Sequence, residues 1–137
     1  MEMQKKILGF VLKENQKNAL SLLCESEHAV LIEIREKDFG KTLGALAKIG
    51  GFPAKPPVPV QNKEIYMVSG PMMVFCGFEQ EELHGFLARY RQMQAEPVEL
   101  KAMMTMHNIF WTPGMLYREL QEEHSAMMAY RTSKKTD

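Results

Sequence analysis

The sequence predicts an α/β domain with a four-stranded, mainly parallel sheet, made of two strand-helix-strand-helix repeats with pseudo-twofold symmetry. The pattern of residues 6–50 recurs in residues 72–128, and both copies begin with an apolar run typical of a strand covered on both faces. A proline-rich linker, residues 51–71, separates the copies. The alternative is a ferredoxin-like α+β sandwich, in which residues 65–68 form an extra strand that changes the order and direction of pairing.

The first copy opens with a strand and a helix. The strand is expected at Lys6–Leu12, which is apolar almost throughout. The helix is expected at Glu14–Glu25, because Ala19, Leu22 and Leu23 fall on one face of a 3.6-residue repeat. That face should pack on the sheet, and the charged residues around it should face water.

The first copy closes with a second strand and a second helix. The strand is expected at His28–Ile34, which is rich in Val, Leu and Ile. Asp38 is a favourable N-cap residue and Gly50-Gly51 is a favourable stop, so a helix is expected between them. Its apolar residues at helical spacing are Phe39, Leu43, Leu46 and Ala47.

The second copy repeats this order. Strands are expected at Met72–Cys76 and Val98–Ala102, with a helix at Glu79–Met93 between them. Thr112-Pro113, a cap followed by proline, starts the last helix, and residues 129–137 are expected to form a flexible tail. The residues expected to face the core are Leu83, Phe86, Leu87 and Tyr90 in the helix and Val98, Leu100 and Ala102 in the strand.

Composition narrows the class of protein. The chain of 137 residues fits one domain, and its 45% hydrophobic and 25% charged residues are ordinary for a globular protein. No apolar run is long enough to span a membrane and the N-terminus lacks a signal-peptide core, so a cytoplasmic protein is expected. Seventeen basic residues balance seventeen acidic ones, which argues against nucleic acid as a partner. Cys24 and Cys76 are expected to be reduced thiols packed as small hydrophobic side chains.

A difference between the copies suggests where a ligand could bind. Only Glu36 and Lys37 separate the second strand from the Asp38 cap, whereas Met103–Trp111 intervenes in the second copy. Such a loop follows the carboxyl end of a strand and leads into a helix N-terminus, which favours an anion. The candidate ligand-binding residues of this region are Lys101, Thr105, His107, Asn108, Trp111 and Thr112.

The structural alternative is that this loop closes the open end of the domain. Phe110 and Trp111 then form an apolar plug, and Thr105 and Asn108 satisfy backbone groups of an irregular turn. This alternative is favoured, because Lys, His and Asn without a partner carboxylate make a weak catalytic signature.

The last helix adds Glu119, Glu123 and His124 to the candidate ligand-binding residues. His124 follows Leu120 by one helical turn on the stripe that leads to Met127, so it is expected to be a core histidine. No His-x-x-x-His or Glu-x-x-His spacing occurs in this helix, and we therefore predict no metal site, no cofactor and no catalytic residue.

One string of residues resembles a known family. It consists of Gly77-Phe78, Leu100-Lys101-Ala102, Thr105, Asn108, Trp111-Thr112, Leu116, Glu119-Leu120 and Glu123-His124. Residues 72–127 resemble, through this string, an uncharacterised bacterial family known only as a domain of unknown function. The resemblance implies a bacterial cytoplasmic protein with no assigned activity, and it supplies no catalytic residue.

Three functions follow from these observations. The leading hypothesis is a non-enzymatic interaction or regulatory module that forms a homodimer or binds a protein partner. The second is a sensor of a small anionic metabolite that binds at residues 101–112. The third is an enzyme that uses His107 or His124 with Glu119 or Glu123.

Overall fold

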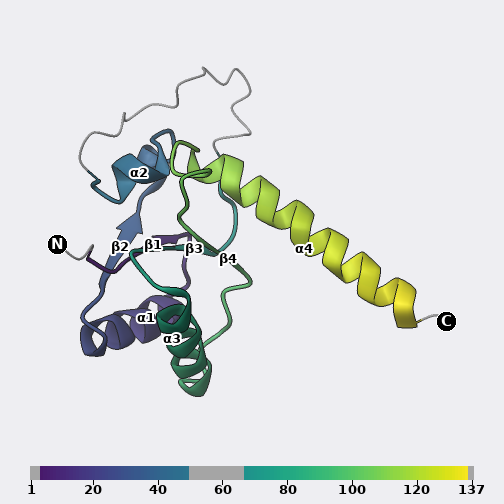
Figure 1. Ribbon diagram of the computed structural model, residues 1–137, viewed down its shortest axis with the longest axis horizontal. Helices are drawn as coiled ribbons and strands as arrows, with labels where there is room; N and C mark the ends of the chain where they lie inside the picture. The colour runs from purple at the N-terminus through teal and green to yellow at the C-terminus, as the bar shows by residue number, and fades with distance from the viewer. Residues whose placement is uncertain (1–3, 50–66, 136–137) are drawn as a thin grey trace.

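The computed structural model describes residues 4–49 and 67–135, and Figure 1 shows their arrangement. Most of the linker predicted at residues 51–71 therefore lies outside the described residues. The elements, in chain order, are β1 (Lys6–Phe10), α1 (Glu14–Ser26), β2 (Val30–Ile34), η1 (Glu36–Asp38, a single 3₁₀ turn), α2 (Leu43–Leu46), β3 (Met72–Cys76), α3 (Gln80–Gln92), β4 (Leu100–Met103) and α4 (Pro113–Lys135).

The described strands form one sheet in the order β2-β1-β3-β4. β1 pairs in parallel with β2, and β3 pairs in parallel with β4. β1 and β3 lie antiparallel at the centre, where Leu8 is opposite Val74. The predicted α/β class and four-stranded, mostly parallel sheet are therefore confirmed. This order involves no linker strand: Met67 and Val68 lie outside the strands, and residues 65 and 66 lie outside the described residues.

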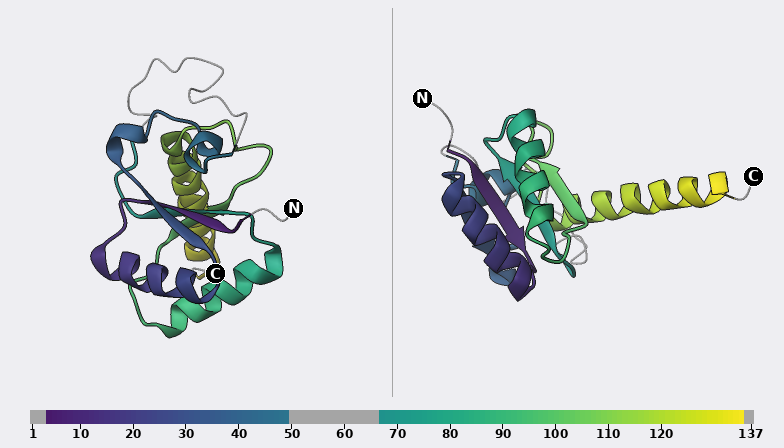
Figure 2. Two further views of the ribbon diagram at one scale, coloured as in Figure 1. Left: turned by 90° about the vertical axis from the view of Figure 1, so that its left-hand side faces the viewer. Right: turned by 90° about the horizontal axis from the view of Figure 1, so that it is seen from below.

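Helices cover both faces of the sheet. α1 and α3 lie on one face, and α2 and the start of α4 lie on the other (Figures 1 and 2). Alternate residues of the central strands fill the two cores, because successive side chains of a strand point to opposite faces. Ile7 and Phe75 belong to the core under α1 and α3, whereas Leu8 and Val74 belong to the core under α2 and α4.

The first strand and helix of each half have matching dimensions. β1 and β3 each have 5 residues, and α1 and α3 each have 13. The turn after each strand contains a residue with positive φ, Val11 at 52° and Gly77 at 80°. The turn after each helix contains another, His28 at 57° and Gln94 at 61°. The sequence suggested that His28 begins the second strand. The residue lies instead in the turn before β2.

The N-cap of α2 is not the residue that the sequence suggested. Asp38 ends the 3₁₀ turn η1 and forms an ion pair with Lys41 at 3.0 Å. Thr42 is the actual N-cap, and its side chain accepts a hydrogen bond from Ala45 N at 3.2 Å. The connection from β2 to this cap is residues 35–41, and the connection from β4 to Thr112 is residues 104–111. The two are nearly equal in length, so the loop at 103–111 is not an insertion into one half.

One predicted core position of α1 was wrong, and one buried residue, Val98, lies on a different face of the sheet from the one expected. Leu22 is 62% exposed, because the buried face of α1 centres on Leu20 and Leu23 and each helical residue is turned by about 100° from the last. Val98 is buried against α3, whereas Leu100 and Ala102 pack on the opposite face of the sheet. The reason is that β4 begins only at Leu100, so strand alternation does not extend back to Val98.

Candidate functional site

The loop between β4 and α4 is held by its own polar side chains. Asn108 is buried; its Oδ1 accepts a hydrogen bond from Thr105 N at 2.8 Å, and its Nδ2 donates to Met103 O at 3.1 Å. Thr105 Oγ1 accepts hydrogen bonds from the backbone N–H groups of His107 and Asn108, both at 3.2 Å. These contacts use both side chains for turn geometry, as the structural alternative predicted.

The same loop completes the N-terminus of α2. Leu43 N donates to Trp111 O at 2.8 Å, and Gly44 N donates to Ile109 O at 2.9 Å. The first amides of a helix have no partner within the helix, so these carbonyls supply the acceptors that α2 lacks. The loop from the second half is therefore part of the framework that holds the first half.

The threonine that starts α4 is also structural. Thr112 is fully buried, and its Oγ1 accepts a hydrogen bond from Met115 N at 3.4 Å. Beside it, the His107 and Trp111 rings meet edge to face, with centroids 5.0 Å apart. His107 is exposed and Trp111 is half-buried, so the pair lies at the surface of the loop.

The remaining candidate residues do not converge on this loop. Lys101 lies on β4 and borders a hollow beside α3, on the face of the sheet opposite to Leu100 and Ala102. Glu119, Glu123 and His124 are exposed on α4. The prediction that His124 is a core histidine is wrong, because α4 leaves the body of the domain after Leu120. The nine predicted residues therefore belong to three separate places.

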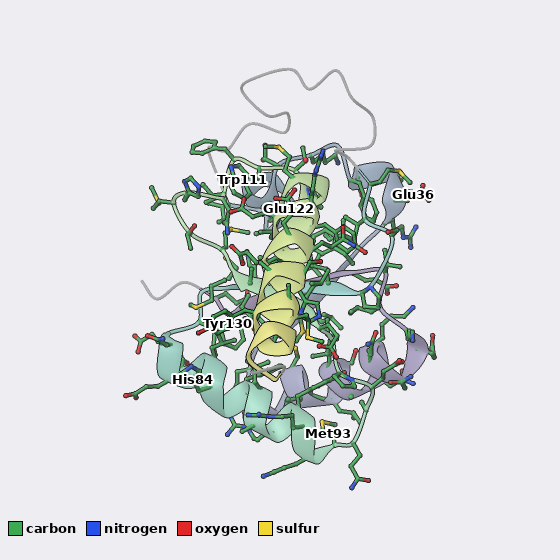
Figure 3. The ribbon with its side chains drawn as sticks, turned by 90° about the vertical axis from the view of Figure 1, so that its right-hand side faces the viewer. Glu36, His84, Met93, Trp111, Glu122 and Tyr130 are labelled. Atoms are coloured by element: carbon green, nitrogen blue, oxygen red, sulfur yellow. The ribbon has the colours of Figure 1, made fainter. Side chains whose placement is uncertain are left out.

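Helix α4 projects from the domain. Figure 1 and the right-hand view of Figure 2 show its second half standing clear of the other elements. In Figure 3, Glu122 and Tyr130 lie on this projecting part, in front of the body. Each residue from 121 to 130 is exposed, including three large apolar ones: Met127 (52%), Met128 (49%) and Tyr130 (61%).

Met127 was expected to lie on a buried stripe, and this exposed surface was not predicted from the sequence. The stripe itself is real, since Leu116 is buried and Leu120 packs against the core below it. A partial signal was present, because the apolar residues at 126–130 follow a polar stretch at 121–125. The exposed surface of α4 from Arg118 to Tyr130 is called the α4 surface below.

A second hollow, of about 670 Å³, lies at the end of β3. Two of its charged groups are already paired, because Lys5 Nζ lies 3.2 Å from Glu82, and Glu82 also accepts a hydrogen bond from Glu79 N. Backbone hydrogen bonding and Lys5 lower the pKa of Glu82, so this carboxylate stays ionised in its pair. The arrangement stabilises the start of α3 and leaves little free charge for a ligand.

Reactive groups are few among the described residues. Cys24 and Cys76 are buried reduced thiols, as predicted, and burial raises the pKa of Cys24 to about 11. A buried thiol with such a pKa is a poor nucleophile. Within residues 4–49 and 67–135, no three His, Cys, Asp or Glu side chains gather in a way that could hold a metal ion. None of the helices in these ranges has the length and apolar character needed to cross a membrane.

Fold and surface together define an α/β domain with one projecting helix. Residues 71–127, which run from just before β3 into the projecting part of α4, match a family described as a domain of unknown function, DUF3783. This confirms the resemblance drawn from the sequence. No curated protein and no solved structure matches the chain significantly.

Proposed function

We propose that this protein is a non-enzymatic interaction module that forms a homodimer through the α4 surface. The observation that carries the proposal is the projection of α4 with Met127, Met128 and Tyr130 about half exposed. Solvent-exposed apolar residues grouped on one element are a common mark of a protein-binding surface. The part of α4 beyond Leu120, residues 121–135, spans about 22 Å at 1.5 Å per residue, enough for an extended helix contact.

The distribution of charge along α4 favours a second copy of this chain as the partner. The turns nearest the body carry Glu119, Glu122 and Glu123, whereas the sequence of the last two turns contains Arg131, Lys134 and Lys135. Two α4 helices packed antiparallel place the acidic turns of each copy beside the basic turns of the other. A parallel pair would instead set like charges together, which is unfavourable.

One antiparallel register satisfies both the charges and the apolar residues. Positions 119, 123, 127, 131 and 135 are each one turn apart and form a ridge along the helix. With position 127 on the dimer axis, position 123 of one copy faces position 131 of the other, and 119 faces 135. Met127 then packs against its own counterpart, as expected in a twofold interface.

The oligomeric state and a cysteine crosslink test this arrangement. We expect the protein to sediment as a dimer and Met127→Cys to form a disulfide between copies on mild oxidation. Ser125→Cys is the matched control, because position 125 is exposed but lies on the opposite side of the helix; it should not crosslink. The buried Cys24 and Cys76 should not interfere. A monomer at high concentration would contradict the proposal, and so would equal crosslinking of both variants.

Charge reversal tests the partner and the direction of packing. Exposed ion pairs contribute about 0.2–1 kcal/mol each, and the twofold axis repeats each one, so Glu119→Lys with Glu123→Lys should weaken the dimer about tenfold or more. Adding Arg131→Glu and Lys135→Glu to the same chain should restore it. Failure of this rescue, with the dimer intact in the wild type, would exclude the antiparallel register. Binding of only an unrelated protein would exclude homodimerisation.

We also propose that the two halves are related by a pseudo-twofold axis between β1 and β3. The support comes from the equal lengths of α1 and α3, the matched turns with positive φ, and the threonine caps Thr42 and Thr112 after connections of similar length. Paired substitutions at equivalent positions, such as Thr42 and Thr112, test this relation.

A further inference from the structure

A small hollow lies between α3 and β4, on the opposite side of the sheet from the start of α4. Its volume is about 180 Å³, and its wall is mainly apolar. Met73 and Val98 are almost fully buried beneath it, while Leu87 and Pro97 form parts of its sides. The ring of Tyr90 completes the wall, with its hydroxyl donating to Glu96 O at 2.6 Å.

Two cationic residues border this hollow. Arg91 lies on the last turn of α3, and Lys101 lies on β4. Within the part of the chain that the structure describes, neither is in an ion pair, and Lys101 Nζ makes one long hydrogen bond, to Val98 O at 3.3 Å. Arg89, two residues before Arg91, is by contrast paired with Glu27.

Among the described residues, neither Arg91 nor Lys101 has a partner carboxylate, whereas several other cations do. Lys5, Lys13 and Lys17 each form an ion pair with a glutamate. Arg91 and Lys101 keep their donors available beside an apolar wall, which is the arrangement that recognises a ligand with an apolar body and one anionic group.

We propose that this hollow binds a small amphipathic carboxylate. An apolar cavity of about 150 Å³ accommodates benzene, so the hollow has room for one ring or a short branched chain. The apolar part would lie against Val98 and Leu87, with the carboxylate between Arg91 and Lys101. Inorganic phosphate fits less well, because it has no apolar part to cover the wall.

This site is independent of the α4 surface. It lies on α3 and β4, so it binds its ligand whether or not two α4 helices pair. Both cations are exposed, and screening by water should make binding weak, with a dissociation constant on the order of 1 mM for a ligand of nine heavy atoms.

Titrations followed by amide NMR test the site, with benzoate as the probe. We expect benzoate to shift resonances of residues 87–101, whereas benzyl alcohol and inorganic phosphate should bind at least tenfold more weakly. Benzyl alcohol keeps the apolar body without the charge, and phosphate keeps the charge without the body. Equal binding of benzoate and benzyl alcohol would overturn the role of the cations. Equal binding of benzoate and phosphate would overturn the role of the wall, and shifts confined to other residues would overturn the site.

Variants of the two cations complete the test. Arg91→Gln and Lys101→Gln should each weaken benzoate binding about tenfold, because each removes one charge-assisted contact. Arg118→Gln is the matched control, since Arg118 is an exposed cation on α4, and it should bind benzoate like the wild type. Unchanged spectra of the free variants away from the substitution will show that they fold. Wild-type affinity in both variants would refute the proposal.

Discussion

The two helices that follow the outer strands, α2 and α4, begin alike and end very differently. Each starts at a buried threonine cap, Thr42 or Thr112, after a connection of similar length. Yet α2 has 4 residues and stays against the body, whereas α4 has 23 and extends past it. The comparison teaches that the two helices resemble one another at their starts and differ chiefly in length, as expected if the proposed relation between the halves holds.

Local sequence explains why one helix stops and the other continues. α2 ends at Leu46 with Ala47 as its C-cap, after which Lys48 takes a φ of 61°, a left-handed conformation typical of helix ends. α4 runs instead through Glu, Gln, Ala and Met residues, which have high helix propensity. Propensity therefore extends α4 beyond Leu120, which still packs against the core.

The largest expected difference between the halves concerns the turn after each central strand. Gly77→Val should destabilise the protein by more than about 2 kcal/mol, because a Cβ there would lie 2.6 Å from Gln4 O and the residue has positive φ. The equivalent change in reverse, Val11→Gly, should leave stability unchanged or slightly higher, since glycine tolerates the φ of 52°. Urea unfolding of both variants measures the effect. A large loss for Val11→Gly would show that the turns are not equivalent.

The threonine caps give the next effect. Thr42→Ala and Thr112→Ala should each cost about 1–2 kcal/mol, because each removes a side-chain acceptor from a helix start. Serine at either position keeps the hydroxyl and is the control. Thermal unfolding should show similar losses for the two alanine variants if the caps are equivalent. A loss of stability at one position only would show that the two halves already differ at the helix start, and not only in the length of the last helix.

The smallest effect is a pH dependence that only one half should show. Glu82 accepts a hydrogen bond from Glu79 N at the start of α3, and Gln16 accepts the equivalent bond from Lys13 N at the start of α1. The pKa of Glu82 is lowered, first by that backbone bond and then by Lys5. Its contribution to stability is therefore present above the unfolded-state pKa and is lost as pH falls through the folded-state pKa.

Glu82→Gln should accordingly make stability less sensitive to acid, since an amide makes the same contact without titrating. Melting temperatures measured between about pH 6 and pH 3, around the normal pKa of a glutamate, test this. Gln16 does not titrate, and its Nε2 also donates to Pro97 O at 3.2 Å, so no such dependence is expected at the start of α1. An unchanged pH profile for Glu82→Gln would show that the capping contact does not contribute to stability.

The sequence predicted the elements that depend on local pattern. β3 was predicted to the residue, and β1, α1 and α3 were predicted within a few residues, because apolar runs and helical spacing determine them. The α2 cap was missed because Asp38 and Thr42 are both good caps. The choice between them rests on long-range contacts, such as Leu43 N to Trp111 O, which no local pattern contains.

The candidate site was harder to predict for the same reason. The periodicity of the last helix correctly places Leu116 and Leu120 on the core but cannot say where the body ends, so His124 and Met127 were wrongly expected to be buried. The turn-forming roles of Thr105 and Asn108 were foreseeable, because such side chains commonly bond to nearby backbone groups. Arg91 and Lys101 border the same hollow only because α3 packs beside β4, and this proximity has no signal in the sequence.

The carbonyls of Ile109 and Trp111 that complete α2 have a consequence for dissection of the molecule. A fragment ending before the 103–111 loop would leave the amides of Leu43 and Gly44 without these acceptors, and four residues are too few to form a helix unaided. Expression of the first half by itself should therefore yield a chain in which α2 melts, and adding the second half in trans should restore it. The junction joins segments far apart in the sequence, so a fragment in which α2 folds must include the loop that ends at Trp111.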